Sequence, residues 1–256
     1  MSDKGLRLSK EKFDQDGYTV ISGLFSATEI DALNVQVNRY VRQIAPTLSD
    51  GDVFYEDPSK PASLKQLEHM NKHDEFFRDY MADSRFRELG ELLLDVPLRP
   101  MNQQWFNKPP AGSSPTPPHQ DGFYFSLEPN EAANMWLALD PVSEKNGCLH
   151  YVAGSHRRGL RPHGRTDTLG FSQGVSNWSA DDDANAVAVA VMAGDLIVHH
   201  SLVIHRAEAN HSNDHRRALG GTYYSRQAVV NDEAHRKYID ELEDLMTEKS
   251  SGASAQ

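Results

Sequence analysis

Hydrophobic positions follow a helical period through much of the first hundred residues. Apolar side chains recur at steps of three and four between Ile30 and Ile44, which predicts the buried face of an amphipathic helix. Ser26 and Glu29 form a capping box ahead of this face, because the Ser26 hydroxyl can accept from the Glu29 backbone N–H while the Glu29 side chain reaches back. The other elements expected in this part are a short strand at 17–21 and helices at 74–81 and 85–94.

From about residue 98 the pattern changes to short β-type runs separated by turn residues. Strands are expected at 98–108, 119–126, 134–140, 148–152, 195–206 and 219–225. Several short strands of this kind are typical of an antiparallel sandwich or barrel. Residues 157–186 show no period, and a loop of this length in a compact domain is usually a lid or a binding segment. A last helix is expected at 232–246, followed by a disordered tail at 250–256.

Composition and charge narrow the class of protein. A chain of 256 residues can bury a core of its own, and 26 Lys and Arg against 37 Asp and Glu give a net charge of −11. This acidic balance argues against a nucleic-acid partner and against docking on an anionic membrane. Cys148 is the single cysteine, which excludes an internal disulfide and a thiolate zinc cluster. No signal-type or bilayer-length apolar run is present, so we expect a cytoplasmic globular protein that acts on a small molecule.

The tripeptide His119-Gln-Asp121 is the first candidate for chemistry. Residues two apart on a strand point to the same face, so the imidazole and the carboxylate can converge. They would form two-thirds of the two-histidine, one-carboxylate set that holds non-haem Fe(II) on one face of an octahedron. With 12 histidines in the chain, such a pair alone is weak evidence, because it also arises by chance.

A second candidate segment runs from Gly194 to His205 as an apolar strand, and Arg216 follows eleven residues later. The turn-rich stretch 210–214 between them suggests a hairpin that places a metal ligand beside a guanidinium able to clamp a carboxylate with two hydrogen bonds. Arg216 could instead be a surface salt-bridge residue. His199 competes with His205 for the ligand role, since six residues along a regular strand return to the same face.

Three motifs in order resemble the phytanoyl-CoA dioxygenase (PhyH) family. They are His119-Gln-Asp-Gly-Phe-Tyr-Phe125, the segment from Asn146-Gly-Cys-Leu to Ser-His156-Arg-Arg-Gly159, and the segment from Gly194-Asp-Leu through His205 to Arg216-Arg-Ala-Leu219. The resemblance covers about residues 10–230. It implies an α+β fold, mainly β with flanking helices. A double-stranded β-helix (jelly-roll, cupin-like) core at about 98–230 would carry the helical part, about 1–97, within a single domain 1–249.

The resemblance also implies a set of site residues and cofactors. Fe(II), 2-oxoglutarate and O2 would be required, with His119, Asp121 and His205 as iron ligands. Arg216 would bind the distal carboxylate of 2-oxoglutarate, Trp136 would lie near it, and Gln104 or Asn102 would supply a polar contact. The spacing to Arg216 favours His205 over His199 and leaves His200 near the site or in the core. Ala207 stands where some relatives carry a hydroxyl, and the presence of Asp121 argues against halogenation.

The substrate is less clearly indicated by the sequence. Basic residues cluster from His156 to Arg165, so Arg158 and Arg161 could bind an anionic substrate, or these arginines could pair with the acids at 181–183. Phe123 and Tyr124 could wall a pocket or pack on a substrate ammonium, or they could be core residues.

We therefore expect a hydroxylase that acts on a C–H bond of a small anionic or zwitterionic molecule, such as 2-aminoethylphosphonate, with release of succinate and CO2. The alternatives are an acyl-CoA hydroxylase of the same family, a non-catalytic cupin-like metal binder and a zinc hydrolase. The oligomeric state is not indicated.

Overall fold

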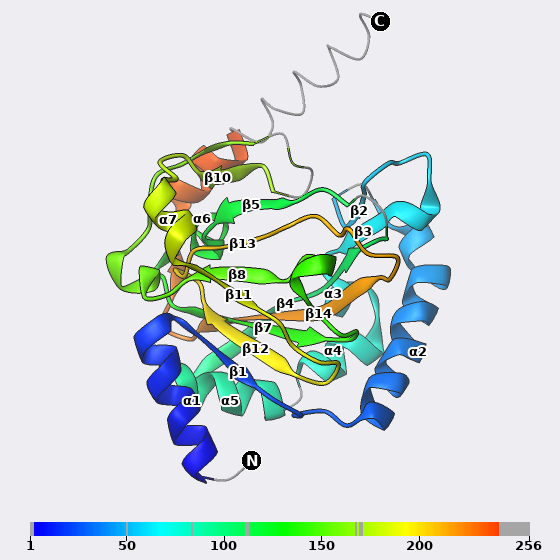
Figure 1. Cartoon of the computed structure of the whole chain (residues 1–256), viewed down its shortest axis with the longest axis horizontal. Coiled ribbons are helices and arrows are strands. Elements are labelled where there is room, and N and C mark those ends of the chain that lie inside the picture. Colours follow the sequence, from blue (N-terminus) through cyan, green and yellow to red (C-terminus); the bar gives the residue numbers. More distant parts are fainter. Residues whose placement is uncertain are drawn as a thin grey trace, which may run out of the picture.

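Two antiparallel sheets form the centre of the protein (Figure 1). The computed structural model describes residues 3–49, 51–82, 84–110, 113–166, 168 and 171–240. The larger sheet has the order β1 (Tyr18–Ile21), β12 (Leu196–His200), β7 (Ala132–Ala138), β14 (Arg216–Ser225), β4 (Leu98–Lys108), β3 (Leu64–Leu67) and β2 (Val53–Tyr55). The smaller sheet has the order β11 (Ala186–Val189), β8 (Leu149–Val152), β13 (His205–Ala207) and β5 (Thr116–His119). Two short pairs complete the strands: β9 (His163–Arg165) with β10 (Gln173–Val175), and β6 (Leu127–Glu128) with β15 (Val229–Val230).

Helices of the N-terminal part cover the larger sheet. They are α1 (Asp3–Asp16), α2 (Ala27–Gln43), α3 (Met70–His73), α4 (Glu75–Met81) and α5 (Ser84–Leu94), of which the last three contact β4 (Figure 1). Short helices α6 (Asp121–Phe125) and α7 (Ala180–Asn185) belong to the β-rich part, with single 3-10 turns at Ala45–Thr47, Pro61–Ser63, Glu144–Asn146 and Ser155–Arg158. The expected class, a jelly-roll core with N-terminal helices packed on it, is confirmed. Within the described residues, no helix is long and apolar enough to cross a membrane.

Side chains on β7 alternate between two hydrophobic cores. Met135 and Leu137 point outward and pack with the helices. Trp136 and Ala138 point inward and pack between the sheets with residues such as Tyr151 of β8. The inward face of the larger sheet therefore carries the residues that can meet those of the smaller sheet.

A polar row crosses this inward face at one level. Asn134 of β7 lies opposite His199 of β12 and Thr222 of β14, and Thr222 lies opposite Asn102 of β4. Adjacent strands are about 4.8 Å apart, so these four side chains are neighbours across the sheet. Polar residues at matched positions on four buried strands indicate a site rather than a packing layer.

Most of the helices expected from periodicity are confirmed. The Ser26–Glu29 capping box is present at the start of α2, and Asp74 caps α4 by accepting from the Phe77 N–H. Helix α1 was not expected, because Phe13 is its single fully buried residue and most of its other side chains are polar. The expected C-terminal helix is described for 232–240, and 241–256, including the expected tail, lie outside the described residues.

Two expected strands are wrong in part. The run 119–126 ends as a strand at His119, and α6 follows because the Gly122 N–H bonds to the carbonyl of Ser201 rather than continuing the ladder. The run 195–206 is broken into β12 and β13, which belong to different sheets. The break is a turn in which the Val203 N–H bonds to the carbonyl of His200.

Two consequences follow for the site residues. His205 and Arg216 do not share a hairpin, because β13 is in the smaller sheet and β14 in the larger one. His199 and His205 likewise lie on different sheets rather than on one strand face, and their ring centres are 4.7 Å apart. The interval 157–186, expected to be without regular structure, contains β9, β10 and α7.

Candidate metal centre

His119, Asp121 and His205 meet between the two sheets. His119 ends β5, Asp121 begins α6, and His205 begins β13 directly opposite His119 in the ladder. Their candidate ligand atoms all lie within 4.8 Å of one another. Asp121 Oδ1 is 3.4 Å from His119 Nε2 and 3.8 Å from His205 Nε2. Asp121 thus converges with His119 from a helical turn, rather than from the strand that the spacing predicted.

Both histidines are oriented by the backbone of their own strand. His119 Nδ1 lies 2.8 Å from the carbonyl of Pro117, and His205 Nδ1 lies 3.2 Å from the carbonyl of Val203. Because a carbonyl only accepts, each Nδ1 carries the proton and each Nε2 lone pair faces the shared point. Burial, with a smaller contribution from His119, lowers the pKa of His205 to about 3, so its imidazole is neutral.

Asp121 is held through its other oxygen. Asn134 donates its amide to Asp121 Oδ2, and His199 Nε2 lies 3.0 Å from the same atom. The Thr222 hydroxyl donates to Asn134 Oδ1 at 2.7 Å, and Tyr151 Oη lies 3.0 Å from His199 Nδ1. Burial alone would raise the pKa of Asp121, but the surrounding histidines, including the hydrogen bond with His199, keep this pKa well below its usual range.

This donor set fits a non-haem iron ion. Two imidazole nitrogens and one carboxylate oxygen would occupy one face of an octahedron and leave the opposite positions open. His199 Nε2 faces Asp121 Oδ2 instead of the point shared by the three candidate ligands. The geometry therefore groups His205, and not His199, with His119 and Asp121.

Arg216 is buried in the larger sheet at the start of β14, with 4% of its surface exposed. Its guanidinium carbon lies 5.3 Å from the centre of the Trp136 ring, and its Nε has no hydrogen-bond partner within the described chain. Burial lowers the pKa of Arg216 to about 10. The next residue, Arg217, faces outward and pairs with Asp140 at 2.7 Å. A surface salt bridge therefore does not account for Arg216.

The family model of phytanoyl-CoA dioxygenase (PhyH) matches residues 13–218. The chain belongs to this family of Fe(II)- and 2-oxoglutarate-dependent oxygenases. It is 26% identical over 235 residues to the peroxisomal phytanoyl-CoA dioxygenase of Rattus norvegicus, covering 86% of this chain and 69% of the relative. It is 27% identical over 209 residues to a probable alpha-ketoglutarate-dependent hypophosphite dioxygenase of Stutzerimonas stutzeri, covering 79% and 73%.

A solved structure supports the same fold. The epimerase SnoN, in complex with Fe3+, alpha ketoglutarate and nogalamycin RO, superposes with a TM-score of 0.73 at 22% identity. The superposition covers 90% of this chain and 87% of that chain. At this level of identity the likeness shows the fold, and the roles of individual residues must come from the site itself.

Small residues form part of the inner core in this PhyH-family chain. Ala138, Ala207 and Ala218 pack in the same inner core as Trp136. Gly220 follows on the inward face of β14, where an added Cβ would lie 2.7 Å from the Phe106 ring. This stretch of the inner face therefore carries no bulky side chain from β14 beyond Arg216.

Gln104 and Asn102, the expected polar contacts of the co-substrate, bind an acid instead. Gln104 Nε2 lies 2.9 and 2.7 Å from the two carboxylate oxygens of Glu68, and Asn102 Nδ2 lies 2.6 Å from Glu68 Oε2. Glu68 was missed by sequence reasoning, because nothing in the run Lys65-Gln-Leu-Glu68 distinguishes it from a surface acid. Two of its amide partners, Asn102 and Gln104, are more than 30 residues away along the chain.

Aromatic rings surround the outer side of the three candidate ligands. Phe123 stacks on His163 at 4.4 Å, and the Tyr124 hydroxyl donates to the carbonyl of Gln173 at 2.6 Å. Tyr238, in the C-terminal helix, packs edge-on against both at 6.1 and 5.6 Å. Phe123 and Tyr124 thus sit beside the metal centre within a packed aromatic cluster.

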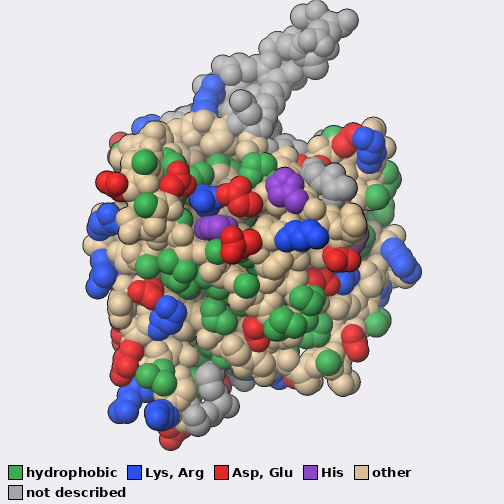
Figure 2. All heavy atoms as spheres, in the orientation of Figure 1, with side chains coloured by type: hydrophobic (Ala, Val, Ile, Leu, Met, Phe, Trp, Pro, Cys, Tyr) green, Lys and Arg blue, Asp and Glu red, His purple; other side chains and the backbone are tan. Residues whose placement is uncertain are grey.

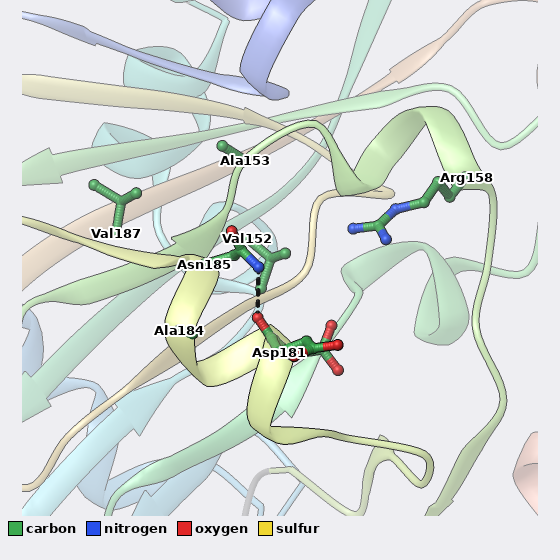
Figure 3. A pocket seen from close by; sticks show the side chains of 8 residues that line it. Val152, Ala153, Arg158, Asp181, Ala184, Asn185 and Val187 are labelled. Carbon is green, nitrogen blue, oxygen red and sulfur yellow. Dashed lines mark hydrogen bonds between the residues drawn. The ribbon is translucent and has the colours of Figure 1, made fainter.

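The arginines expected to bind an anionic substrate lie elsewhere. Arg161 donates to Asp182 at 2.8 Å and to Asn177 at 3.0 Å. Arg158 points into a surface cavity of about 550 Å³ whose wall includes Asp181 and Asn185 of α7 (Figure 3). None of the three candidate ligands lines this cavity. Acidic and basic side chains are also interspersed on the face shown in Figure 2. These contacts favour the alternative in which the arginines face the acids at 181–183.

Proposed function

We propose that this PhyH-family protein hydroxylates a C–H bond of a small polar molecule, with release of succinate and CO2. His119, Asp121 and His205 would hold Fe(II), and Arg216 would hold the distal carboxylate of 2-oxoglutarate. The bound iron, with 2-oxoglutarate and O2, supplies the oxidising chemistry. The observation that carries this proposal is the approach of three ligand atoms to within 4.8 Å, together with a buried arginine in the larger sheet.

The chain's own residues fix the geometry of the ion. The backbone carbonyls that accept from Nδ1 keep both imidazoles in the tautomer that presents Nε2. Asn134 and His199 occupy Asp121 Oδ2, so Oδ1 is the oxygen left for the metal. A carboxylate that binds through one oxygen would leave room at the ion for 2-oxoglutarate and O2.

Arg216 would anchor the co-substrate at the far end from the iron. A guanidinium binds a carboxylate through two parallel hydrogen bonds, and such a pair is stronger where water is excluded. The indole of Trp136 lies beside the guanidinium and would form a wall for the bound carboxylate. Because Arg216 has no acidic partner of its own within the described chain, it is available for this role.

The substrate is proposed to be small and polar, anionic or zwitterionic, with an aminoalkylphosphonate such as 2-aminoethylphosphonate as the leading candidate. A relative named for hypophosphite, a phosphorus oxyanion, supports a substrate of this size. The polar inward residues Asn102, Gln104 and Glu68 also favour a polar molecule over a long acyl chain. An acyl-CoA substrate stays the alternative, because other relatives are named for phytanoyl-CoA.

The proposed function is tested with the full chain loaded with Fe(II) and 2-oxoglutarate under anaerobic conditions. We expect a visible charge-transfer band and, once O2 is admitted, succinate formation that small phosphonates, amino acids or acyl-CoAs stimulate. His119→Ala and Asp121→Ala should abolish both signals while leaving the folded state intact by circular dichroism. A folded wild-type protein without the band, or one whose activity needs zinc and ignores 2-oxoglutarate, would contradict the proposal.

A further inference from the structure

Glu68 is an acid on the inner side of the larger sheet that the proposed chemistry leaves unused. It directly follows β3, in which Gln66 lies opposite Phe106, a residue packed against the inner core. Its two carboxylate oxygens accept hydrogen bonds from the side-chain amides of Gln66, Asn102 and Gln104. Three neutral donors therefore hold this carboxylate in one orientation.

The charge of Glu68 is not balanced by the protein. Within the described residues, no lysine or arginine forms an ion pair with it, whereas Asp74 pairs with Arg39 at 2.8 Å. The imidazole of His69, the next residue, is bound to Asp52 at 2.8 Å. Burial raises the pKa of Glu68, and the amide hydrogen bonds and the neighbouring His69 imidazole oppose this effect. A desolvated carboxylate whose hydrogen bonds all come from amide side chains favours a cation as its remaining partner.

Glu68 is connected to the metal centre across the polar row. Asn102, which donates to Glu68, lies opposite Thr222, and Thr222 bonds to the Asn134 that holds Asp121. Asn134 and Asn102 are two strand spacings apart, or about 10 Å. Glu68 and Asp121 are thus each held by one of two asparagines whose separation is roughly the length of a small metabolite.

The inward face of β4 keeps accessible surface where Glu68 is bound. Asn102, Gln104 and Phe106 point inward and are partly exposed, whereas Gln103 and Trp105 on the outward face are buried beneath the helices. Over this stretch the inward face of β4 is the more accessible one, so the inner side of the sheet beside Asn102 is not fully packed.

Arg216, the proposed anchor of the co-substrate, lies away from Glu68 along the larger sheet. Arg216 lies opposite Lys108, whereas Gln104 is four residues away along β4, or about 13 Å. Arg216 and Glu68 are therefore at separate places, one positive and one negative. Because Arg216 is assigned to 2-oxoglutarate, Glu68 is available to bind the substrate.

We infer that Glu68 determines substrate specificity by binding a positively charged nitrogen of the substrate, an ammonium or a guanidinium. This inference rests on the proposed function, and it narrows the substrate to a molecule that carries a cation a few bonds from the reacting carbon. An uncharged isostere would leave the carboxylate of Glu68 without a cationic partner, which is the condition under which polar sites discriminate most strongly. We expect a preference for the cation on the order of 100-fold.

The test compares matched probes on the wild-type protein loaded with Fe(II) and 2-oxoglutarate. The pairs are 2-aminoethylphosphonate with propylphosphonate, phosphoethanolamine with propyl phosphate, and 4-aminobutyrate with pentanoate. Each pair exchanges an ammonium for a methyl group at nearly constant shape. We expect cationic members to perturb the charge-transfer band at concentrations about 100-fold lower than their partners. Equal responses within the pairs, or no response to any cation, would overturn the inference.

Two variants connect the preference to this side chain. Glu68→Gln removes the charge at constant size and should abolish the discrimination, while Glu75→Gln, an exposed acid of α4, should retain it. The band with Fe(II) and 2-oxoglutarate should persist in Glu68→Gln, because none of its proposed ligands is changed. A wild-type protein that lacks the band contradicts the proposed function itself. A protein that forms the band while Glu68→Gln keeps full discrimination overturns only the role of Glu68.

Discussion

His199 Nε2 lies 3.0 Å from Asp121 Oδ2, on the side of the carboxylate that faces away from His119 and His205. His199 Nδ1 is in turn 3.0 Å from the hydroxyl of Tyr151, which stacks on Tyr18 at 4.3 Å. A hydroxyl that donates to Nδ1 fixes the tautomer in which Nε2 carries the proton. His199 is therefore a positioning residue that holds the proposed iron ligand.

Replacing His199 should weaken metal binding without removing a ligand. His199→Leu removes one of the two partners that hold Asp121 Oδ2, and the loss of such an outer partner typically lowers metal affinity by about 10- to 100-fold. His199→Gln restores a donor near the same place and should recover part of the affinity. The measurement is a titration with Fe(II) or Co(II) followed by ligand-field absorption, with the exposed His211→Leu as the control. Equal affinity in His199→Leu and His211→Leu would contradict the positioning role.

Arg216 and Arg217 form a natural pair for testing the co-substrate anchor. Arg216 is buried beside Trp136, whereas Arg217 points to the other face and pairs with Asp140. Arg216→Met should raise the Kd of 2-oxoglutarate by about 100-fold, because a buried carboxylate would lose its charged partner. Arg217→Met should leave this Kd nearly unchanged. Titration of the charge-transfer band measures both values, and an unchanged Kd in Arg216→Met would refute its assigned role.

The sequence predicted the elements that local patterns determine. The stripe and capping box of α2 are local features, and the structure confirms them. The break between β12 and β13 was missed, because one apolar run serves two strands that are buried in different sheets. The opposed sheets also explain why the expected hairpin of His205 and Arg216 was wrong. Where a chain changes sheets depends on contacts that are distant in sequence, such as that of the Gly122 N–H with the Ser201 carbonyl.

The same distinction between local patterns and distant contacts applies to the site residues. His119, Asp121 and His205 were found because their types and order carry a signal. His199 was found only as a rival ligand, since its contact with Asp121 spans 78 positions of the chain. Glu68 could not be predicted from the sequence, because its proposed role depends on amides of another strand, Asn102 and Gln104 of β4. It depends also on the absence of an ion-pairing lysine or arginine among the described residues. A role that follows from the residue type and its order in a motif can be predicted from sequence. A role that depends on contacts with residues distant in sequence cannot.

Lys108 should make stability depend on pH in the alkaline range. Burial, with smaller contributions from Arg216 and Lys65 that exceed the opposing effect of Glu56, lowers the pKa of Lys108 to about 7. Between about pH 7 and 10.5 the unfolded chain therefore holds a proton that the folded chain lacks, and stability rises with pH. Below pH 7 Lys108 is charged in the folded state as well. The cost of burying this charge then lowers the free energy of unfolding by on the order of a few kcal/mol.

Lys108→Met removes this titration. The variant should gain stability over wild type at pH 7, reduced by the loss of the hydrogen bond from Lys108 Nζ to the Ser114 carbonyl at 2.7 Å. The gain should shrink as the pH is raised toward 10. Urea unfolding at pH 7, 8.5 and 9.5 measures the difference, and the exposed Lys145→Met provides the control. A difference that is constant over this range would show that Lys108 titrates near its ordinary pKa.

Gly122 separates Asp121 from the aromatic cluster and has no room for a side chain. A Cβ at this position would lie 2.8 Å from Asn130 Nδ2, which itself donates to the Gly122 carbonyl at 2.8 Å. Gly122→Ala should therefore displace Asn130, shift the start of α6 and weaken metal binding several-fold, with a loss of about 1 kcal/mol in the free energy of unfolding. Adding Asn130→Ala removes the clash, so the double variant should bind metal more tightly than Gly122→Ala alone. A double-mutant cycle on metal affinity measures this coupling. Strict additivity would mean that contact with Asn130 is not the reason for glycine beside the proposed ligand.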